Sequence, residues 1–166
     1  MPQLRCIRPC LWFDNQAEEA ADFYVSVFPN SKITQITRFN ESGSEIHGRS
    51  SGTIMALTFE LNGQPFMALN GGPMFKFNEA ISLIVECDTQ QEIDYFWEKL
   101  SQGGDPQTQQ CGWLKDKYGL SWQVVPSKLS EYLADHTSER ARRAMAAILQ
   151  MKKLDIAAIE CAAVAR

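Results

Sequence analysis

Few residues of this chain combine the side-chain type and the spacing that a catalytic centre requires. The chain has two histidines, His47 and His136. A serine nucleophile needs a positioned histidine and a carboxylate, and neither histidine is predicted to lie beside Ser82 or Ser121. The sequence therefore predicts no nucleophilic triad.

Three acidic residues, Glu60, Glu86 and Asp116, fall near the ends of predicted strands. A general base there would need a raised pKa, which a sequence does not encode. We interpret these carboxylates as solvated charges and assign no catalytic residue.

The cysteines indicate neither a zinc site nor a disulfide framework, because their number is odd and no Cys-x-x-Cys pair occurs. They are Cys6, Cys10, Cys87, Cys111 and Cys161. We interpret Cys10, Cys87 and Cys111, which lie in apolar runs, as small buried hydrophobes. A reactive thiol would need a cationic neighbour, and Arg8 is the one cation evident near them.

One hairpin organises the prediction of structure. Residues Cys111 to Pro126 read as two strands about the turn Asp116–Gly119. Alternation places Leu120, Trp122 and Val124 on a face that packs against a helix, and Ser121, Gln123 and Val125 on the opposite face. Because an inward amide needs hydrogen-bond partners, we expect a ligand or water near Gln123.

The N-terminal half is predicted to contain a strand, a helix and then three strands. The predicted strands are 6–13, 31–39, 53–61 and 65–70, with an Asn62-Gly63 turn signal between the last two. Asn15 and Glu18 have capping-box spacing at the start of a helix that ends before Pro29. Residues 40–52 are polar and glycine-rich, so we predict a mobile loop.

The same order then begins again. Residues 80–87 form a predicted strand, and Thr89 and Glu92 repeat the capping-box spacing before a helix that ends near Gly103. The segment 14–18 resembles 88–92, and 63–67 aligns with 119–123. An internal repeat of this length implies that the two halves bury their sheets together.

After Pro126 the pattern becomes helical. We predict a short helix through Leu129 and Leu133 and a longer helical region from Ser138, with an apolar stripe that includes Met145 and residues 152–156. Three arginines lie on the other side of this region, at Arg140, Arg142 and Arg143. An acidic partner is possible in principle, but a solvated helix face is the commoner explanation.

Composition limits the class of protein. The 166 residues, 45% of them hydrophobic, suit one domain or two small modules that share a core. A net charge of −4 argues against nucleic-acid binding. No apolar run approaches the roughly 20 residues that cross a bilayer, so we expect no membrane partner and a cytoplasmic location.

Three motifs resemble the PhnB-like family of the vicinal oxygen chelate superfamily, which includes glyoxalase I, bleomycin-resistance proteins and extradiol dioxygenases. They are residues 10–13, 66–73 and 113–126, and the resemblance extends over about residues 5–155. The family also carries the label 3-demethylubiquinone-9 3-methyltransferase-like. The resemblance implies an α+β fold in which two βαβββ modules curl around a pocket, usually in a homodimer. We place the modules at 5–75 and 76–126, within a glyoxalase-like region 1–126, and a helical extension at 127–166.

The resemblance also implies where a metal would bind in related enzymes. The corresponding positions are Ile7, Ile81, Met67 and Gln123, of which the Gln123 amide alone offers a hard ligand. We therefore expect no bound metal and no cofactor. A methyltransferase of the Rossmann type would have a glycine-rich turn after its first strand, whereas residues 13–17 contain no glycine.

The primary hypothesis is a homodimer that binds a small apolar or aromatic molecule in a metal-free pocket. The predicted lining is Trp12, Met55, Phe59, Met67, Leu69, Trp113 and Gln123, with Asn70 at the rim. Four alternatives stay open: a metal-dependent isomerase, lyase or dioxygenase-type enzyme, a methyltransferase, a sequestering drug-resistance protein, and a structural module that interacts through its tail.

Overall fold

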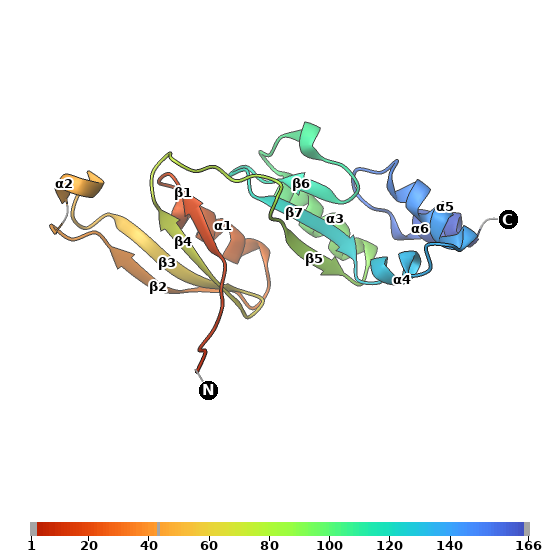
Figure 1. The fold of residues 1–166 in the computed structure, drawn as a ribbon, viewed down its shortest axis with the longest axis horizontal. Helices are drawn as coiled ribbons and strands as arrows, with labels where there is room; N and C mark the ends of the chain where they lie inside the picture. Colours follow the sequence, from red (N-terminus) through yellow and green to blue (C-terminus); the bar gives the residue numbers. More distant parts are fainter. Residues whose placement is uncertain (1–2, 43, 165–166) are drawn as a thin grey trace. The chain divides into compact units, whose positions relative to one another are not determined.

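A computed structural model describes residues 3–42 and 44–164 (Figure 1). The chain divides into two compact units, Met1–Lys76 and Phe77–Arg166. Both combine a small sheet with helices, so the predicted α+β class is confirmed.

The first unit contains the predicted βαβββ arrangement. Its elements are β1 (Cys10–Phe13), α1 (Ala17–Val27), β2 (Lys32–Arg38), α2 (Ser44–His47), β3 (Ile54–Leu61) and β4 (Gln64–Asn70). The sheet order is β1-β4-β3-β2, and the β1/β4 pair is parallel whereas the other pairs are antiparallel. Two parallel neighbours in a sheet need a crossover connection between them. Here that connection contains α1, β2 and β3, which lie between β1 and β4 in the sequence.

Helix α1 covers one face of this sheet. Three alanines, Ala17, Ala20 and Ala21, are fully buried, and such short side chains let the helix backbone approach the strands closely. Tyr24 of α1 stacks on Phe59 of β3 with ring centroids 6.4 Å apart, and Phe59 stacks on Phe66 of β4 at 5.4 Å. This aromatic row identifies the face of the sheet that α1 covers.

Two predictions for the first unit are corrected in detail. The first strand begins at Cys10 rather than at residue 6, because Pro9 has no N–H to donate; its carbonyl accepts a bond from the Met67 N–H at 2.9 Å. The segment 40–52, predicted as a loop, contains the single helical turn α2. The Asn62-Gly63 turn is confirmed, with φ of 46° and 82°.

The second unit repeats the arrangement with one strand fewer in the part of the chain that the structure describes. Its strands and first helix are β5 (Leu83–Cys87), α3 (Gln90–Ser101), β6 (Trp113–Lys115) and β7 (Ser121–Pro126), in the sheet order β5-β7-β6 with β5 and β7 parallel. A short 3-10 helix, Pro106–Thr108, lies between α3 and β6. The predicted hairpin about the turn 116–119 is confirmed by the antiparallel pairing of β6 and β7.

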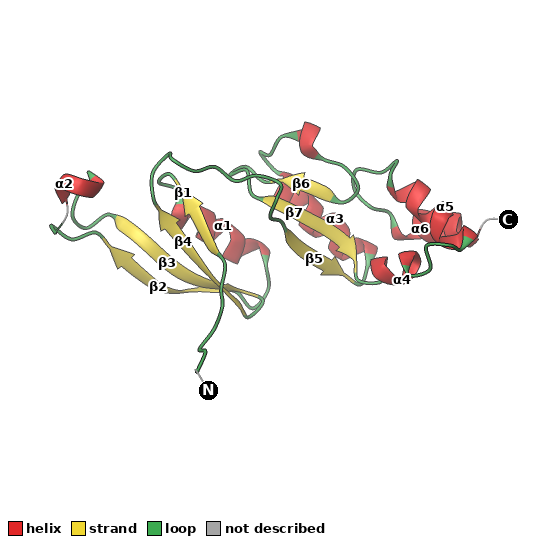
Figure 2. Cartoon of the chain, in the orientation of Figure 1, coloured by secondary structure: helices red, strands yellow, loops and turns green. Residues whose placement is uncertain are grey.

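Three C-terminal helices belong to the second unit. They are α4 (Leu129–Leu133), α5 (Glu139–Ile148) and α6 (Ile156–Val164), shown in red in Figure 2. The predicted helical region after Ser138 is therefore two helices, and the non-helical stretch between them holds the fully buried Leu154.

These helices share a core cluster with the sheet. Its buried members are Val125, Tyr132, Ala144, Ile148, Leu154, Ile159 and Ala163. Val125 was predicted to share a strand face with Gln123, on which a ligand was expected, and it packs instead among residues of the C-terminal helices. The extension is thus part of the second unit's hydrophobic core.

Candidate functional site

The face of the first sheet that α1 does not cover carries three of the predicted lining residues. Strand pairing places Cys10 and Trp12 of β1 beside Met67 and Leu69 of β4. Alternation puts these four on the face opposite to Phe59 and its stacking partners. Trp12, Met67 and Leu69 are half-buried. We call these three residues the open face of the first unit.

The Trp12 indole is held in place by the glycines that follow β4. Its Nε1–H donates to the Gly72 carbonyl at 2.8 Å, and its ring lies against Gly71, where an added Cβ would come within 2.1 Å of the ring. Phe75 meets the indole edge-on, with ring centroids 4.9 Å apart. Because any side chain at residue 71 would collide with the ring, Gly71 is required for this indole position.

The other predicted lining residues of the first unit lie on the α1 side. Phe59 is 1% exposed in the aromatic row, and alternation along β3 places Met55 on the same face. Asn70 is a helix cap: its Oδ1 accepts the Ala17 N–H of α1 at 2.9 Å, and its Nδ2 donates to the Ile54 carbonyl at 3.0 Å.

The prediction that Asn15 and Glu18 form a capping box is wrong, because Asn70 supplies the side-chain cap of α1. The N-cap residue of α1 is Gln16, and no side-chain bond caps the helix from that position. The acceptor comes from a strand 53 residues later in the chain. Spacing rules compare near neighbours only, so sequence reasoning had no means of finding it.

In the second unit, Trp113 and Gln123 lie directly opposite each other on β6 and β7. Both are half-buried, and Gln123 Nε2 donates to Ser82 Oγ at 2.8 Å. Ile84, the β5 partner of Gln123, is 59% exposed. We call Trp113, Gln123 and Ile84 the open face of the second unit. The Gln123 amide has one protein partner here and retains capacity for another.

Asp116, interpreted as a solvated charge, is instead 3% exposed. Its carboxylate accepts the N–H groups of Tyr118 and Leu120 at 2.8 and 3.1 Å and the Trp122 indole N–H at 2.8 Å. These bonds organise the hairpin turn, so Asp116 is a structural residue. Its position two residues before Tyr118 in a polar turn was a detectable signal, because aspartate commonly bonds the backbone two residues on.

The donor set does not fit a resident divalent metal. Ile7 and Ile81 are 81% and 73% exposed and lie outside any strand. Among the described residues, no three side chains of histidine, cysteine, aspartate or glutamate come together as ligands would. Zinc sites in proteins have three or four such ligands, so no step is assigned to a metal.

The thiols differ in burial. Cys6, Cys10 and Cys161 are exposed and Cys111 is half-buried, whereas Cys87 is buried. Burial, with smaller contributions from the Glu92 and Asp88 carboxylates, raises the pKa of Cys87 to about 12. The prediction that Cys10 is buried is wrong. Strand β1 lies at the edge of its sheet, and Cys10 is the first residue of that strand, where its side chain is exposed.

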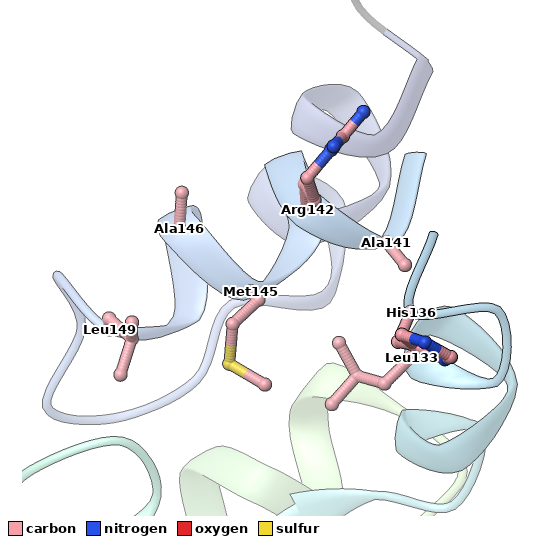
Figure 3. Close-up of a pocket in the computed structure, with 7 residues that line it drawn as sticks. All are labelled: Leu133, His136, Ala141, Arg142, Met145, Ala146 and Leu149. Atoms are coloured by element: carbon pink, nitrogen blue, oxygen red, sulfur yellow. The ribbon is translucent and has the colours of Figure 1, made fainter. Parts of the chain in front are cut away.

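Two of the hollows that lie away from the open faces differ in polarity. A polar one of about 640 Å³ is lined by Asn15, Glu18, Arg38, Phe39, Gly48, Arg49, Ser50, Gly52, Thr53, Ile54 and Asn70. A smaller apolar one of about 320 Å³ lies between α4 and α5, where Leu133 and Met145 face each other and Arg142 points away (Figure 3). Neither contains a cluster of catalytic groups.

Comparison with known proteins places the fold and the family. The model of the family described as 3-demethylubiquinone-9 3-methyltransferase matches residues 5–125. A structure described as a putative 3-demethylubiquinone-9 3-methyltransferase, PhnB protein, from Bacillus cereus is 40% identical, with a TM-score of 0.62, over 72% of this chain and 98% of the other. A search of curated proteins gave no match.

Two more distant structures share the fold. Protein PA1353 from Pseudomonas aeruginosa is 19% identical, with a TM-score of 0.56, over 72% of this chain and 96% of the other. The fosfomycin resistance protein FosX from Listeria monocytogenes, in complex with Mn(II) and sulfate, is 12% identical, with a TM-score of 0.52, over 81% of this chain and 99% of the other.

In residues 3–42 and 44–164, no helix is long and apolar enough to cross a membrane.

Proposed function

This chain belongs to the 3-demethylubiquinone-9 3-methyltransferase family, which is PhnB-like and lies in the vicinal oxygen chelate superfamily, and we propose that it binds a small apolar or aromatic molecule on its open sheet faces. No resident metal takes part in this proposal.

The observation that carries the proposal is the fixed, half-buried indole of Trp12. The ring is positioned by Gly72 on one side and by the close approach of Gly71 on another. Met67 and Leu69 continue an apolar surface beside it. An aromatic side chain that is already ordered loses little freedom on binding a flat ligand, and offset or edge-on ring contacts contribute about 1 kcal/mol beyond area burial.

The open face of the second unit supplies a similar aromatic residue and one polar group. Trp113 presents a half-buried indole, and the Gln123 amide retains hydrogen-bonding capacity beside Ser82. A few polar groups on mostly apolar walls are typical of small-molecule sites. We therefore propose that a molecule bound at this face of the second unit carries at least one hydrogen-bonding group.

The structure of FosX contains Mn(II), but we do not propose a metal for this chain. The positions that the superfamily resemblance indicates hold Ile7, Ile81 and Met67, none of which offers a nitrogen or oxygen side-chain ligand. Gln123 alone would be an incomplete site. Full activity of a metal-stripped protein on any identified substrate would agree with this proposal.

Methyl transfer, which the family description names, receives no support from the residues. The turn after β1, residues 13–17, contains no glycine. In each sheet the described parallel pairing is confined to two strands, β1 with β4 and β5 with β7, unlike the extended parallel sheet of Rossmann-type enzymes. Saturable micromolar binding of S-adenosylmethionine in a calorimeter would contradict this conclusion.

We also propose a homodimer. The exposed apolar side chains of Met74, Phe75, Ile81 and Ile84 support it, because burial of such side chains against a second subunit removes apolar surface from water. Light scattering coupled to size-exclusion chromatography would measure the molar mass, and a monomer at every concentration would exclude the dimer.

The test of ligand binding compares two tryptophans. The full chain is titrated with 1-naphthol, a neutral aromatic probe, by calorimetry, first as wild type and then as W12L and W97L. Trp97 is a half-buried residue of α3, so W97L controls for loss of an indole elsewhere. We expect saturable binding that W12L weakens at least tenfold and W97L changes less than twofold. Absent binding, or equal loss in both variants, would overturn the proposal.

A further inference from the structure

The segment between β2 and β3 forms an arm with a closed base. The Phe39 N–H donates to the Thr53 carbonyl, and the Gly52 N–H donates to the Phe39 carbonyl, both at 2.8 Å. These two bonds hold the ends of the excursion together, so the residues between them leave the sheet and return at one place. The returning half of the arm, which follows α2 in the sequence, carries Arg49.

Arg49 joins this arm to the turn that follows β1. Its Nη2 donates to the Asp14 carbonyl at 3.1 Å and lies 3.6 Å from the Asp14 carboxylate. The Arg49 side chain is 30% exposed. One guanidinium nitrogen thus combines a hydrogen bond to the Asp14 carbonyl with an ion-pair contact to the Asp14 carboxylate. The arm is therefore attached to the β1 end of the sheet by a directed interaction.

The same Asp14 carbonyl is connected to Trp12 through hydrogen bonds of Gly72. It accepts a second bond from the Gly72 N–H at 3.2 Å, and the Gly72 carbonyl accepts the Trp12 indole N–H at 2.8 Å. Gly72 has φ of 93°, and a Cβ there would lie 3.4 Å from the Arg49 guanidinium. Arg49 thus packs on the residue that holds the indole.

We propose that Arg49 is a positioning residue that holds Trp12 in its ligand-binding orientation through Asp14 and Gly72. The inference rests on the proposed function, because Trp12 is the centre of the proposed ligand surface. It adds control of that surface: when Arg49 leaves Asp14, the loop 71–72 gains freedom and the indole is less ordered. The apparent ligand affinity is then the intrinsic affinity multiplied by the fraction of molecules in which Trp12 is in place, so it falls as that fraction falls.

Arg38 provides a matched control. It is an exposed arginine at the end of β2, and its guanidinium donates to the Gly52 carbonyl at 2.9 Å, within the base of the arm. Both R38A and R49A remove one positive charge and one arginine-to-carbonyl bond. Arg49 is the one of the two that reaches Asp14.

The experiment uses the full chain labelled with 5-fluorotryptophan, in which each of the four tryptophans gives a fluorine resonance. The Trp12 signal is assigned by its loss in W12F. In the ligand-free protein we expect R49A to shift and broaden the Trp12 signal and R38A to leave it unchanged. With 1-naphthol, R49A should weaken binding about fivefold, R38A less than twofold, and R49K should recover part of the loss.

The outcomes separate this inference from the proposed function. If wild type fails to bind 1-naphthol, the proposed function fails, while the ligand-free Trp12 signal still tests the connection to Arg49. If R49A leaves the Trp12 signal unchanged, or if R38A perturbs it equally, the positioning role is overturned. Urea unfolding of both variants measures their global stability. If a loss of global stability in R49A accounts for the change in the Trp12 signal, the positioning role is also overturned.

Discussion

The two units cap corresponding helices in different ways. Helix α1 receives its cap from Asn70, the last residue of β4, whereas α3 is capped locally: the Glu92 N–H donates to Thr89 Oγ at 3.2 Å and the Thr89 N–H donates to the Glu92 carboxylate at 2.9 Å. The last residue of β7 is Pro126, which offers no side-chain acceptor. A repeated topology therefore does not require repeated contacts, because any acceptor near the first amides satisfies them.

The sheets also differ on the face away from their first helix. In the first unit, Trp12, Met67 and Leu69 are half-buried. In the second, Val125 is 5% exposed in the cluster formed with the C-terminal helices, while Gln123 stays half-buried. The family match ends at residue 125, just before these helices. The comparison indicates that the extension stabilises the second unit, whose described sheet has one strand fewer.

The largest expected effect distinguishes the two hairpins. D116A removes a buried carboxylate and leaves the Trp122 indole N–H and two backbone N–H groups without that acceptor, at a cost of about 4 kcal/mol. N62A changes the corresponding turn of the first unit, where φ is 46°, and should cost about 1 kcal/mol. Urea unfolding of both variants measures the difference, and equal costs would show that the two turns are equivalent.

L154A tests whether the extension is integral to the second unit. Leu154 is fully buried in the cluster with Val125, so its truncation should cost about 3 kcal/mol by lost burial and cavity formation. The control L149A truncates a leucine that is 53% exposed and should cost less than about 1 kcal/mol. If thermal unfolding of L154A matched that of wild type, the helices would be an appendage rather than part of the core.

N70A and T89A test the caps directly. Asn70 is half-buried and bonds both α1 and the Ile54 carbonyl, so its loss should cost about 2 kcal/mol, against about 1 kcal/mol for the exposed cap at Thr89. Denaturant midpoints with unchanged slopes would give the two values. A larger cost for T89A would mean that the long-range cap is the weaker one.

The smallest effect concerns acid. The Lys153 ammonium, 2.5 Å away, and then Gln90 lower the pKa of Asp94 below its ordinary 3.8. Since the folded-state pKa is lower than the unfolded one, this contribution to stability is present above about pH 4 and is lost as the pH falls through the lowered value. D94N should therefore lose less stability than wild type between pH 5 and pH 3, which urea titrations at each pH would reveal. Parallel curves would contradict the prediction.

Local patterns were sufficient for most of the elements. The Asn62-Gly63 turn, the Thr89–Glu92 capping box and the hairpin about residues 116–119 each depend on residues within a few positions of one another, and all three are present. The predicted lining residues of the first unit lie on both faces of its sheet. Alternation brings Trp12, Met67 and Leu69 to one face, but the side on which α1 packs decides that Phe59 belongs to the core.

The sequence by itself determined the order of strands and helices, the internal repeat and the poverty of metal ligands, because hydrophobic period, turn residues and residue types are properties of the chain alone. Only the tertiary structure decided that Asn70 caps α1, that the buried Asp116 accepts the Trp122 indole N–H, and that Arg49 is connected to Trp12 through Asp14 and Gly72. Each of these contacts depends on where a folded backbone places a donor and an acceptor. Sequence spacing carries no record of that distance.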